Sequence, residues 1–150
     1  MALTGKLGAD IEINAPAAAF YNVWKSQCHH LPNATPSNMQ AVEVHEGDWE
    51  TAGSIKLWNY TVAGRSESYK ERIEVDDETM TVGLVGLEGD VFKNYKSWKP
   101  IIQVIPKESG SLLKLTLEYE KRSEDVPVPN EYLDFMVSVM TDLAAHLTKA

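Results

Sequence analysis

The chain has 150 residues, of which 43% are hydrophobic and 24% charged, and its formal net charge is −8. This composition predicts one globular domain over residues 1–150, because a chain of this length buries about two-thirds of its unfolded surface without disulfides or metals. The acidic balance argues against nucleic acid or anionic lipid as a partner, since like charges repel. No apolar run approaches the ~18 residues of a membrane helix, so we expect no membrane insertion.

The cysteine content and the first residues favour a cytoplasmic location. Cys28 is the single cysteine, so no internal disulfide can form, which suits a reducing compartment. Residues 1–6 lack the basic segment and apolar stretch of a secretory signal peptide. We therefore expect a cytoplasmic protein, present as a monomer or a weak dimer.

The first third of the chain begins with a strand and continues with helical patterns. Over residues 6–13 apolar and polar side chains alternate, which predicts a half-buried strand. Asn14 is the predicted N-cap of a helix over residues 17–25. Residues 29–37 contain two prolines and are predicted to form a loop or a short second helix.

The rest of the chain predicts six more strands and a long helix. The strand patterns cover residues 40–46, 54–63, 66–75, 79–87, 91–105 and 111–122. Beyond Pro129, apolar residues recur every three or four positions to Leu147, which predicts an amphipathic helix of about five turns. Seven antiparallel strands must close or receive a helix to bury one face, so we expect an α+β fold with the sheet curved around this helix. Such a fold leaves room for a ligand between sheet and helix.

The predicted inner faces carry large rings and soft methionines, a composition that can surround a cavity. The alternative is that the same side chains form an ordinary filled core. The predicted ligand-binding residues are Trp24, Trp58, Tyr60, Tyr69, Val82, Leu84, Trp98, Met136, Val139 and Met140.

Two titratable residues are candidates for proton transfer. Glu71 alternates with Tyr69 and Ile73, so a regular strand places its carboxyl group inside, where burial disfavours the charged form. The alternative is a bulge that leaves Glu71 facing solvent. His30 precedes Leu31 in the predicted second helix and is a candidate second proton carrier, although a structural role is the simpler interpretation.

The known catalytic and metal-binding motifs are missing from the sequence. There is no GxGxxG, P-loop, HExxH, GxSxG or paired CxxC pattern. The spacing of the four histidines and Cys28 does not match a zinc site. Residues 46–54 hold only two glycines among three acids, which disfavours phosphate binding there. We therefore expect neither a metal nor a cofactor.

Taken in order, several segments carry a family resemblance over nearly the whole chain. They are Leu3-Thr4-Gly5-Lys6-Leu7, His30-Leu31-Pro32-Asn33, Thr35-Pro36, His45-Glu46-Gly47, residues 53–60, Lys70-Glu71, Glu88-Gly89-Asp90, Tyr119-Glu120-Lys121 and residues 132–135. The chain resembles the major latex protein branch of the birch-pollen-allergen and pathogenesis-related class ten superfamily of plants. The resemblance implies the helix-grip fold: a seven-stranded antiparallel sheet, two short helices after the first strand, and a long C-terminal helix over a large apolar cavity.

The resemblance also implies a function. Members of this superfamily bind hydrophobic plant metabolites, and some are cofactor-free enzymes of specialised metabolism. Our first hypothesis is therefore binding of a small hydrophobic metabolite, in specialised metabolism or defence. The alternative is a cofactor-free cyclase, isomerase or lyase acting on a reactive terpenoid (iridoid-type) or alkaloid intermediate. A lone Glu71 in the cavity favours binding, whereas Glu71 beside His30 or a tyrosine hydroxyl favours catalysis.

Overall fold

The computed structural model describes residues 3–149, which form a seven-stranded antiparallel sheet and three α-helices. The strands are β1 (Thr4–Ile13), β2 (Met39–Glu46), β3 (Ile55–Val62), β4 (Arg65–Asp76), β5 (Thr81–Gly89), β6 (Tyr95–Pro106) and β7 (Ser111–Lys121). The helices are α1 (Ala17–Ser26), α2 (Leu31–Ala34) and α3 (Asn130–Leu147), with 3₁₀ turns η1 (Cys28–His30) and η2 (Asp90–Lys93). The predicted fold class is confirmed.

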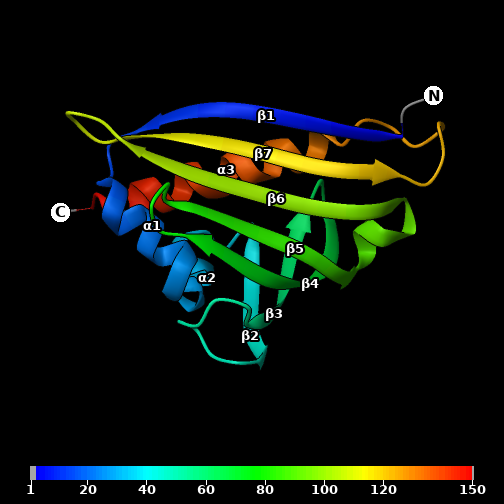
Figure 1. Ribbon diagram of the computed structural model, residues 1–150, viewed down its shortest axis with the longest axis horizontal. Coiled ribbons are helices and arrows are strands. Elements are labelled where there is room, and N and C mark those ends of the chain that lie inside the picture. Colours follow the sequence, from blue (N-terminus) through cyan, green and yellow to red (C-terminus); the bar gives the residue numbers. More distant parts are fainter. Residues whose placement is uncertain (1–2, 150) are drawn as a thin grey trace.

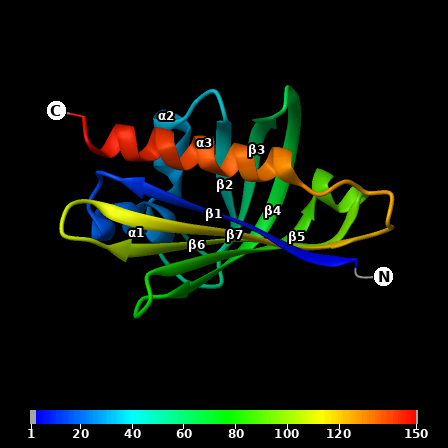
Figure 2. The same cartoon turned by 90° about the horizontal axis from the view of Figure 1, so that it is seen from above.

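The sheet and the long helix form two layers. The strand order is β1-β7-β6-β5-β4-β3-β2, so the first two strands of the chain form the two edges. The helix α3 runs along one face of the sheet, and α1 and α2 lie together at one end (Figures 1 and 2). The buried face of α3 comprises Met136, Val139, Met140, Leu143 and Ala144, in agreement with the predicted three-and-four spacing.

Three local predictions were wrong at element ends. Pro16, not Asn14, occupies the N-cap position of α1. Residues 91–94 do not extend a strand, because the Asp90 carboxylate accepts the Ser68 backbone N–H at 2.7 Å and the chain turns into η2. The strand predicted from residue 79 begins at residue 81, because Met80 has a positive φ of 50°.

A polar cluster fixes α3 against the segment between α1 and the sheet. The buried Thr35 hydroxyl donates to the Asp142 carboxylate at 2.7 Å. Nearby, the Asn38 side-chain amide donates to the Ser138 hydroxyl at 3.0 Å. The two bonds join residues that are 107 and 100 positions apart in the chain, so they tie α3 to the segment that follows α2.

Candidate functional site

An apolar cavity of about 70 Å³ lies between the inner face of the sheet and α3. Nine of the ten predicted ligand-binding residues line it: Trp24, Trp58, Tyr60, Tyr69, Leu84, Trp98, Met136, Val139 and Met140. The other lining residues are Met39, Pro100, Ile102, Tyr132 and Phe135. The cavity is smaller than the large one implied by the family resemblance, because these rings and methionines fill most of the space.

The tenth predicted residue, Val82, is fully buried but is not part of the cavity lining. It lies at the start of β5, next to the turn whose Asp77 carboxylate accepts a hydrogen bond from Tyr21 of α1 at 2.7 Å. Val82 therefore contributes to the core at that end of the molecule. Whether the nine lining residues contact a ligand stays a prediction.

Ring contacts organise the cavity wall. Trp24 and Trp58 have ring centroids 6.1 Å apart, and Tyr60 lies 5.2 Å from Phe135 of α3. The Tyr69 hydroxyl donates to the backbone carbonyls of Leu84 and Trp98 at 2.7 and 3.1 Å, which satisfies its polar end. Rings that are held in this way present apolar faces to the cavity and suit a flat apolar guest.

Glu71 is fully buried, as its alternation with Tyr69 and Ile73 predicts, but it is not part of the cavity lining. Its carboxylate accepts a hydrogen bond from the Trp58 indole Nε1 at 3.0 Å. Because the Trp58 ring lines the cavity, this hydrogen bond links Glu71 to the cavity wall. Burial raises the pKa of Glu71 to about 7, against the opposing effects of the Lys56 charge and the Trp58 hydrogen bond.

Lys56 is a buried residue that the sequence analysis did not single out. It pairs with Glu71 in the register of β3 and β4, and its side chain is fully buried. The strand alternation Lys56, Trp58, Tyr60 already placed it on the inner face, so this signal was present in the sequence. Among residues 3–149, the buried polar atoms without a hydrogen-bond partner are Trp24 Nε1, Lys56 Nζ and Glu71 Oε2.

Cys28 is buried beside the same polar residues. Its thiol donates to the Trp24 backbone carbonyl at 3.1 Å. Burial raises the pKa of this thiol to about 12, with a smaller lowering effect from the Lys56 charge. A thiol in this state is a poor nucleophile, so Cys28 serves as a core residue.

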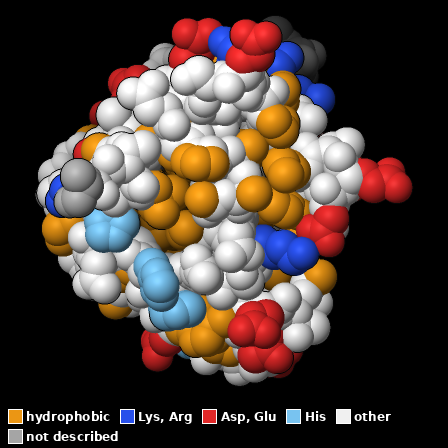
Figure 3. Space-filling view, turned by 90° about the vertical axis from the view of Figure 1, so that its left-hand side faces the viewer, with side chains coloured by type: hydrophobic (Ala, Val, Ile, Leu, Met, Phe, Trp, Pro, Cys, Tyr) orange, Lys and Arg blue, Asp and Glu red, His pale blue; other side chains and the backbone are white. Residues whose placement is uncertain are grey.

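His30 does not meet Glu71. It is exposed on η1, where its ring stacks edge-on against His29 at a centroid distance of 4.3 Å. Histidines lie on the surface at the end of the molecule shown in Figure 3. The two residues selected as proton carriers are therefore not brought together, and their catalytic roles stay a prediction.

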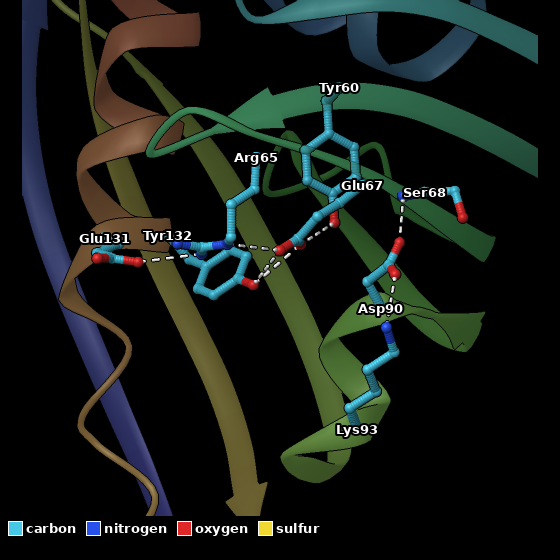
Figure 4. Close-up of polar contacts among 8 residues, drawn as sticks. All are labelled: Tyr60, Arg65, Glu67, Ser68, Asp90, Lys93, Glu131 and Tyr132. Carbon is cyan, nitrogen blue, oxygen red and sulfur yellow. Dashed lines mark hydrogen bonds and ion pairs between the residues drawn. The ribbon is translucent and has the colours of Figure 1, made fainter.

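A second polar group lies beside the cavity, next to the lining residues Tyr60 and Tyr132, and the sequence analysis missed it. The Glu67 carboxylate accepts hydrogen bonds from the hydroxyls of Tyr60 at 3.2 Å and Tyr132 at 2.9 Å (Figure 4). It also accepts one from Arg65 Nε at 3.3 Å, and Arg65 Nη2 reaches Glu131 at 3.0 Å. The Glu67 side chain is only 8% exposed. This Glu67 cluster joins the β3–β4 hairpin to the beginning of α3.

The hairpin geometry sets the position of the Glu67 cluster. Ala63 and Gly64 form its two-residue turn, and both have a positive φ, as tight hairpin turns require. Burial, followed by the nearby Glu67 charge, raises the pKa of the Tyr60 hydroxyl. Burial also raises the pKa of Tyr132 to about 12. Both hydroxyls are therefore protonated near neutral pH and act as hydrogen-bond donors.

Residues 3–149 contain no group of three or more His, Cys, Asp or Glu side chains that could hold a metal ion. Within the same range, no helix has the length and apolar character needed to cross a membrane.

Comparison with known proteins gives a consistent assignment. The model of the pathogenesis-related protein Bet v 1 family matches residues 2–150. MLP-like protein 328 of Arabidopsis thaliana is 38% identical over 151 residues, covering 100% of both chains. The crystal structure of major latex-like protein 151 from Panax ginseng is 36% identical, with a TM-score of 0.95 over 98% of this chain and 99% of that one.

A more distant neighbour is an enzyme. Norcoclaurine synthase from Thalictrum flavum, in complex with dopamine and hydroxybenzaldehyde, has a TM-score of 0.72 and 22% identity, covering 98% of this chain and 90% of that one. At this identity the likeness concerns the fold alone.

Proposed function

Because the chain belongs to the pathogenesis-related protein Bet v 1 family, with major latex-like proteins among its relatives, we propose that it binds a small hydrophobic plant metabolite in the cavity under α3. The observation that carries the proposal is the apolar lining of aromatic rings and methionines between sheet and helix. The family's known ligands and the lack of a converging Glu71–His30 pair support binding over catalysis. In this proposal, the protein is a monomer or weak dimer that acts in the cytoplasm, in specialised metabolism or defence.

A cavity of about 70 Å³ must enlarge to hold a metabolite, since small-molecule pockets typically measure about 300–1,000 Å³. Met39, Met136 and Met140 provide the means, because unbranched methionine side chains adopt other rotamers at low cost. Met136 and Met140 lie on α3, so their rearrangement widens the space directly beneath the helix.

The first test is displacement of a fluorescent apolar dye. The native protein is expected to bind ANS, and apolar metabolites such as steroids and flavonoids should displace it. Met136→Ala enlarges the cavity and removes a largely buried side chain, so we expect a stability loss of about 2 kcal/mol and a shift of preference toward bulkier competitors. Asn33→Ala, an exposed change on α2, serves as the control. A native protein that leaves ANS fluorescence unchanged would contradict the proposal, as would a Met136→Ala variant with unchanged stability and preference.

A second candidate function is cofactor-free catalysis in the same cavity, as a cyclase, isomerase or lyase of a terpenoid or alkaloid intermediate. The observation that favours it is the Glu67 cluster, in which a carboxylate accepts hydrogen bonds from the hydroxyls of two tyrosines that line the cavity. Such a set can move a proton to or from a bound substrate.

Mass spectrometry of the protein incubated with pooled plant metabolites tests this candidate. If the protein is a catalyst, the wild type should form new products. A Glu67→Gln variant should form them at a rate at least about a hundredfold lower while still binding the substrate. The matched control is Glu131→Gln, whose carboxylate contacts Arg65 outside the cavity. Bound metabolites recovered unchanged by both proteins would exclude catalysis on that pool.

A further inference from the structure

The three buried polar side-chain atoms that have no hydrogen-bond partner within residues 3–149 come from residues that are neighbours in the fold. They are Trp24 Nε1, Lys56 Nζ and Glu71 Oε2. Lys56 and Glu71 lie opposite each other on β3 and β4, and both side chains are fully buried. Buried polar groups in proteins are almost always hydrogen-bonded, so three unsatisfied atoms in one region indicate a binding site for a small polar species.

Trp24 of α1 lies beside this pair of strand residues. The ring centroids of Trp24 and Trp58 are 6.1 Å apart, and Trp58 Nε1 donates to Glu71 Oε1 at 3.0 Å. The Trp24 backbone carbonyl accepts the Cys28 thiol at 3.1 Å. After desolvation, the charges of Lys56 and Glu71 are what shift the pKa of that thiol. The three unsatisfied atoms therefore belong to one buried group, the Lys56 cluster, formed by Trp24, Lys56 and Glu71.

The hydrogen-bond chemistry of the Lys56 cluster selects an acceptor. An indole N–H and an ammonium group can only donate hydrogen bonds. Glu71 Oε1 already accepts the Trp58 indole, so a proton on this carboxyl group lies on Oε2, the atom without a partner. In this state all three unsatisfied atoms are donors, and no described residue accepts from them. A single anion can accept hydrogen bonds from all three at once.

The charge of the cluster also selects an anion. A lysine is almost never fully buried without a partner, yet no ion pair among residues 3–149 includes Lys56. The exposed Asp48 carboxylate feels the Lys56 charge, but it accepts the backbone N–H groups of Glu50 and Thr51 and the Thr51 hydroxyl instead. A buried charge without compensation is costly, and a bound anion offsets that cost.

We propose that the Lys56 cluster binds a small monovalent anion, such as chloride, between Trp24, Lys56 and Glu71. Enclosure by buried side chains favours a compact halide over a bulkier phosphate, sulfate or carboxylate. Lys56 and Glu71 are not among the residues that line the cavity under α3. The anion site is therefore distinct from that cavity, and it does not depend on which metabolite the cavity holds.

Anion binding should weaken as the pH rises through about 7, the value to which burial raises the pKa of Glu71. The ionised carboxylate repels an anion, and its Oε2 no longer donates. The other titratable groups that face Glu71 are Lys56 of β3, Cys28 of η1 and Tyr69 of β4. Burial raises the pKa of the Cys28 thiol to about 12 and holds the pKa of Tyr69 well above its ordinary value, so both stay uncharged in this range. The two histidines of η1 are exposed.

Thermal unfolding in sodium chloride and in sodium gluconate at equal ionic strength tests the proposal, because gluconate is too large for the site. At pH 6, chloride at tenfold its Kd should raise the Tm by about 4 °C relative to gluconate. At pH 8 the difference should be much smaller. Bromide soaked into crystals at pH 6 should give an anomalous-scattering peak within hydrogen-bond distance of Lys56 Nζ and Trp24 Nε1.

Three variants separate this site from general salt effects. Lys56→Met replaces the buried ammonium with an apolar side chain of similar length, and it should abolish both the chloride effect and the bromide peak. Lys99→Met removes a partly exposed ammonium that pairs with Glu74, and this matched control should retain both. Glu71→Gln places an amide donor at the position of Oε2 at every pH, so its chloride effect should be equal at pH 6 and pH 8.

The proposal is overturned by an equal wild-type Tm in the two salts at pH 6, or by a water molecule in place of bromide at the site. A chloride effect that survives in Lys56→Met, or that still falls with pH in Glu71→Gln, would overturn it as well. If Lys56→Met does not fold, the wild-type bromide peak and the Glu71→Gln comparison decide the question.

Discussion

Between pH 4 and pH 8, the difference in unfolding free energy between the Glu71→Gln variant and the wild type is expected to grow by about 3 kcal/mol in favour of the variant. The reason is the buried Glu71 carboxyl group, whose pKa rises from the ordinary 4.5 to about 7 in the folded protein, chiefly through desolvation. Glutamine keeps the shape and a hydrogen-bonding tip for the Trp58 indole, but it cannot ionise.

The sign follows from proton binding in the two states. The unfolded carboxyl ionises around pH 4.5 and the folded one around pH 7, so the folded state holds the extra proton between these values. Wild-type stability from this group is therefore present at low pH and is lost as the pH rises through about 7. The Gln variant resembles the protonated wild type at every pH, which is why the difference grows with pH.

Urea unfolding of both proteins at several pH values measures this difference. Asp77→Asn provides a control of opposite sign, because the Lys25 and Tyr21 hydrogen bonds lower the pKa of Asp77. That variant should lose stability relative to the wild type as the pH rises. A Glu71→Gln difference that is constant with pH would mean that Glu71 ionises alike in the folded and unfolded states.

Strand alternation predicted the inner faces well because it is a local property of the backbone. It placed Glu71 inside, and the same rule applied to β3 and β4 would also have placed Lys56 and Glu67 inside. These two were overlooked because charged residues are usually exposed. The helix α3 was equally predictable, since its apolar spacing persists over about five turns.

Features that depend on contacts between distant segments were not predictable from local patterns. The Glu67 cluster joins the β3–β4 hairpin to the beginning of α3, more than sixty positions later in the chain, and no periodicity links the two segments. The turn at η2 depends on the hydrogen bond between Asp90 of η2 and the Ser68 backbone of β4, which lies 22 positions earlier in the chain. The cavity volume depends on how rings and methionines fill the space, which composition does not determine. His30 was placed near the cavity from its neighbour Leu31, whereas η1 turns its side chain outward.

Replacement of Trp98 by Ala is expected to cost about 3–5 kcal/mol of stability and to enlarge the cavity that this ring lines. The Trp98 side chain is almost completely buried, and its ring contacts Tyr95 at 4.7 Å and Tyr132 at 4.8 Å between centroids. Its removal leaves an indole-sized space beside the cavity. It also deprives Tyr132, which lines the cavity and belongs to the Glu67 cluster, of its edge-to-face partner.

Rescue by indole distinguishes this cavity effect from a general loss of structure. An apolar cavity of the right shape binds the missing ring, and a ligand that binds only the folded state raises the unfolding temperature. Added indole should therefore stabilise Trp98→Ala. It should not stabilise Trp49→Ala, a matched change at a partly exposed tryptophan beside His29. A stability loss below about 1 kcal/mol for Trp98→Ala, or equal indole stabilisation of both variants, would show that this ring does not fill the cavity wall.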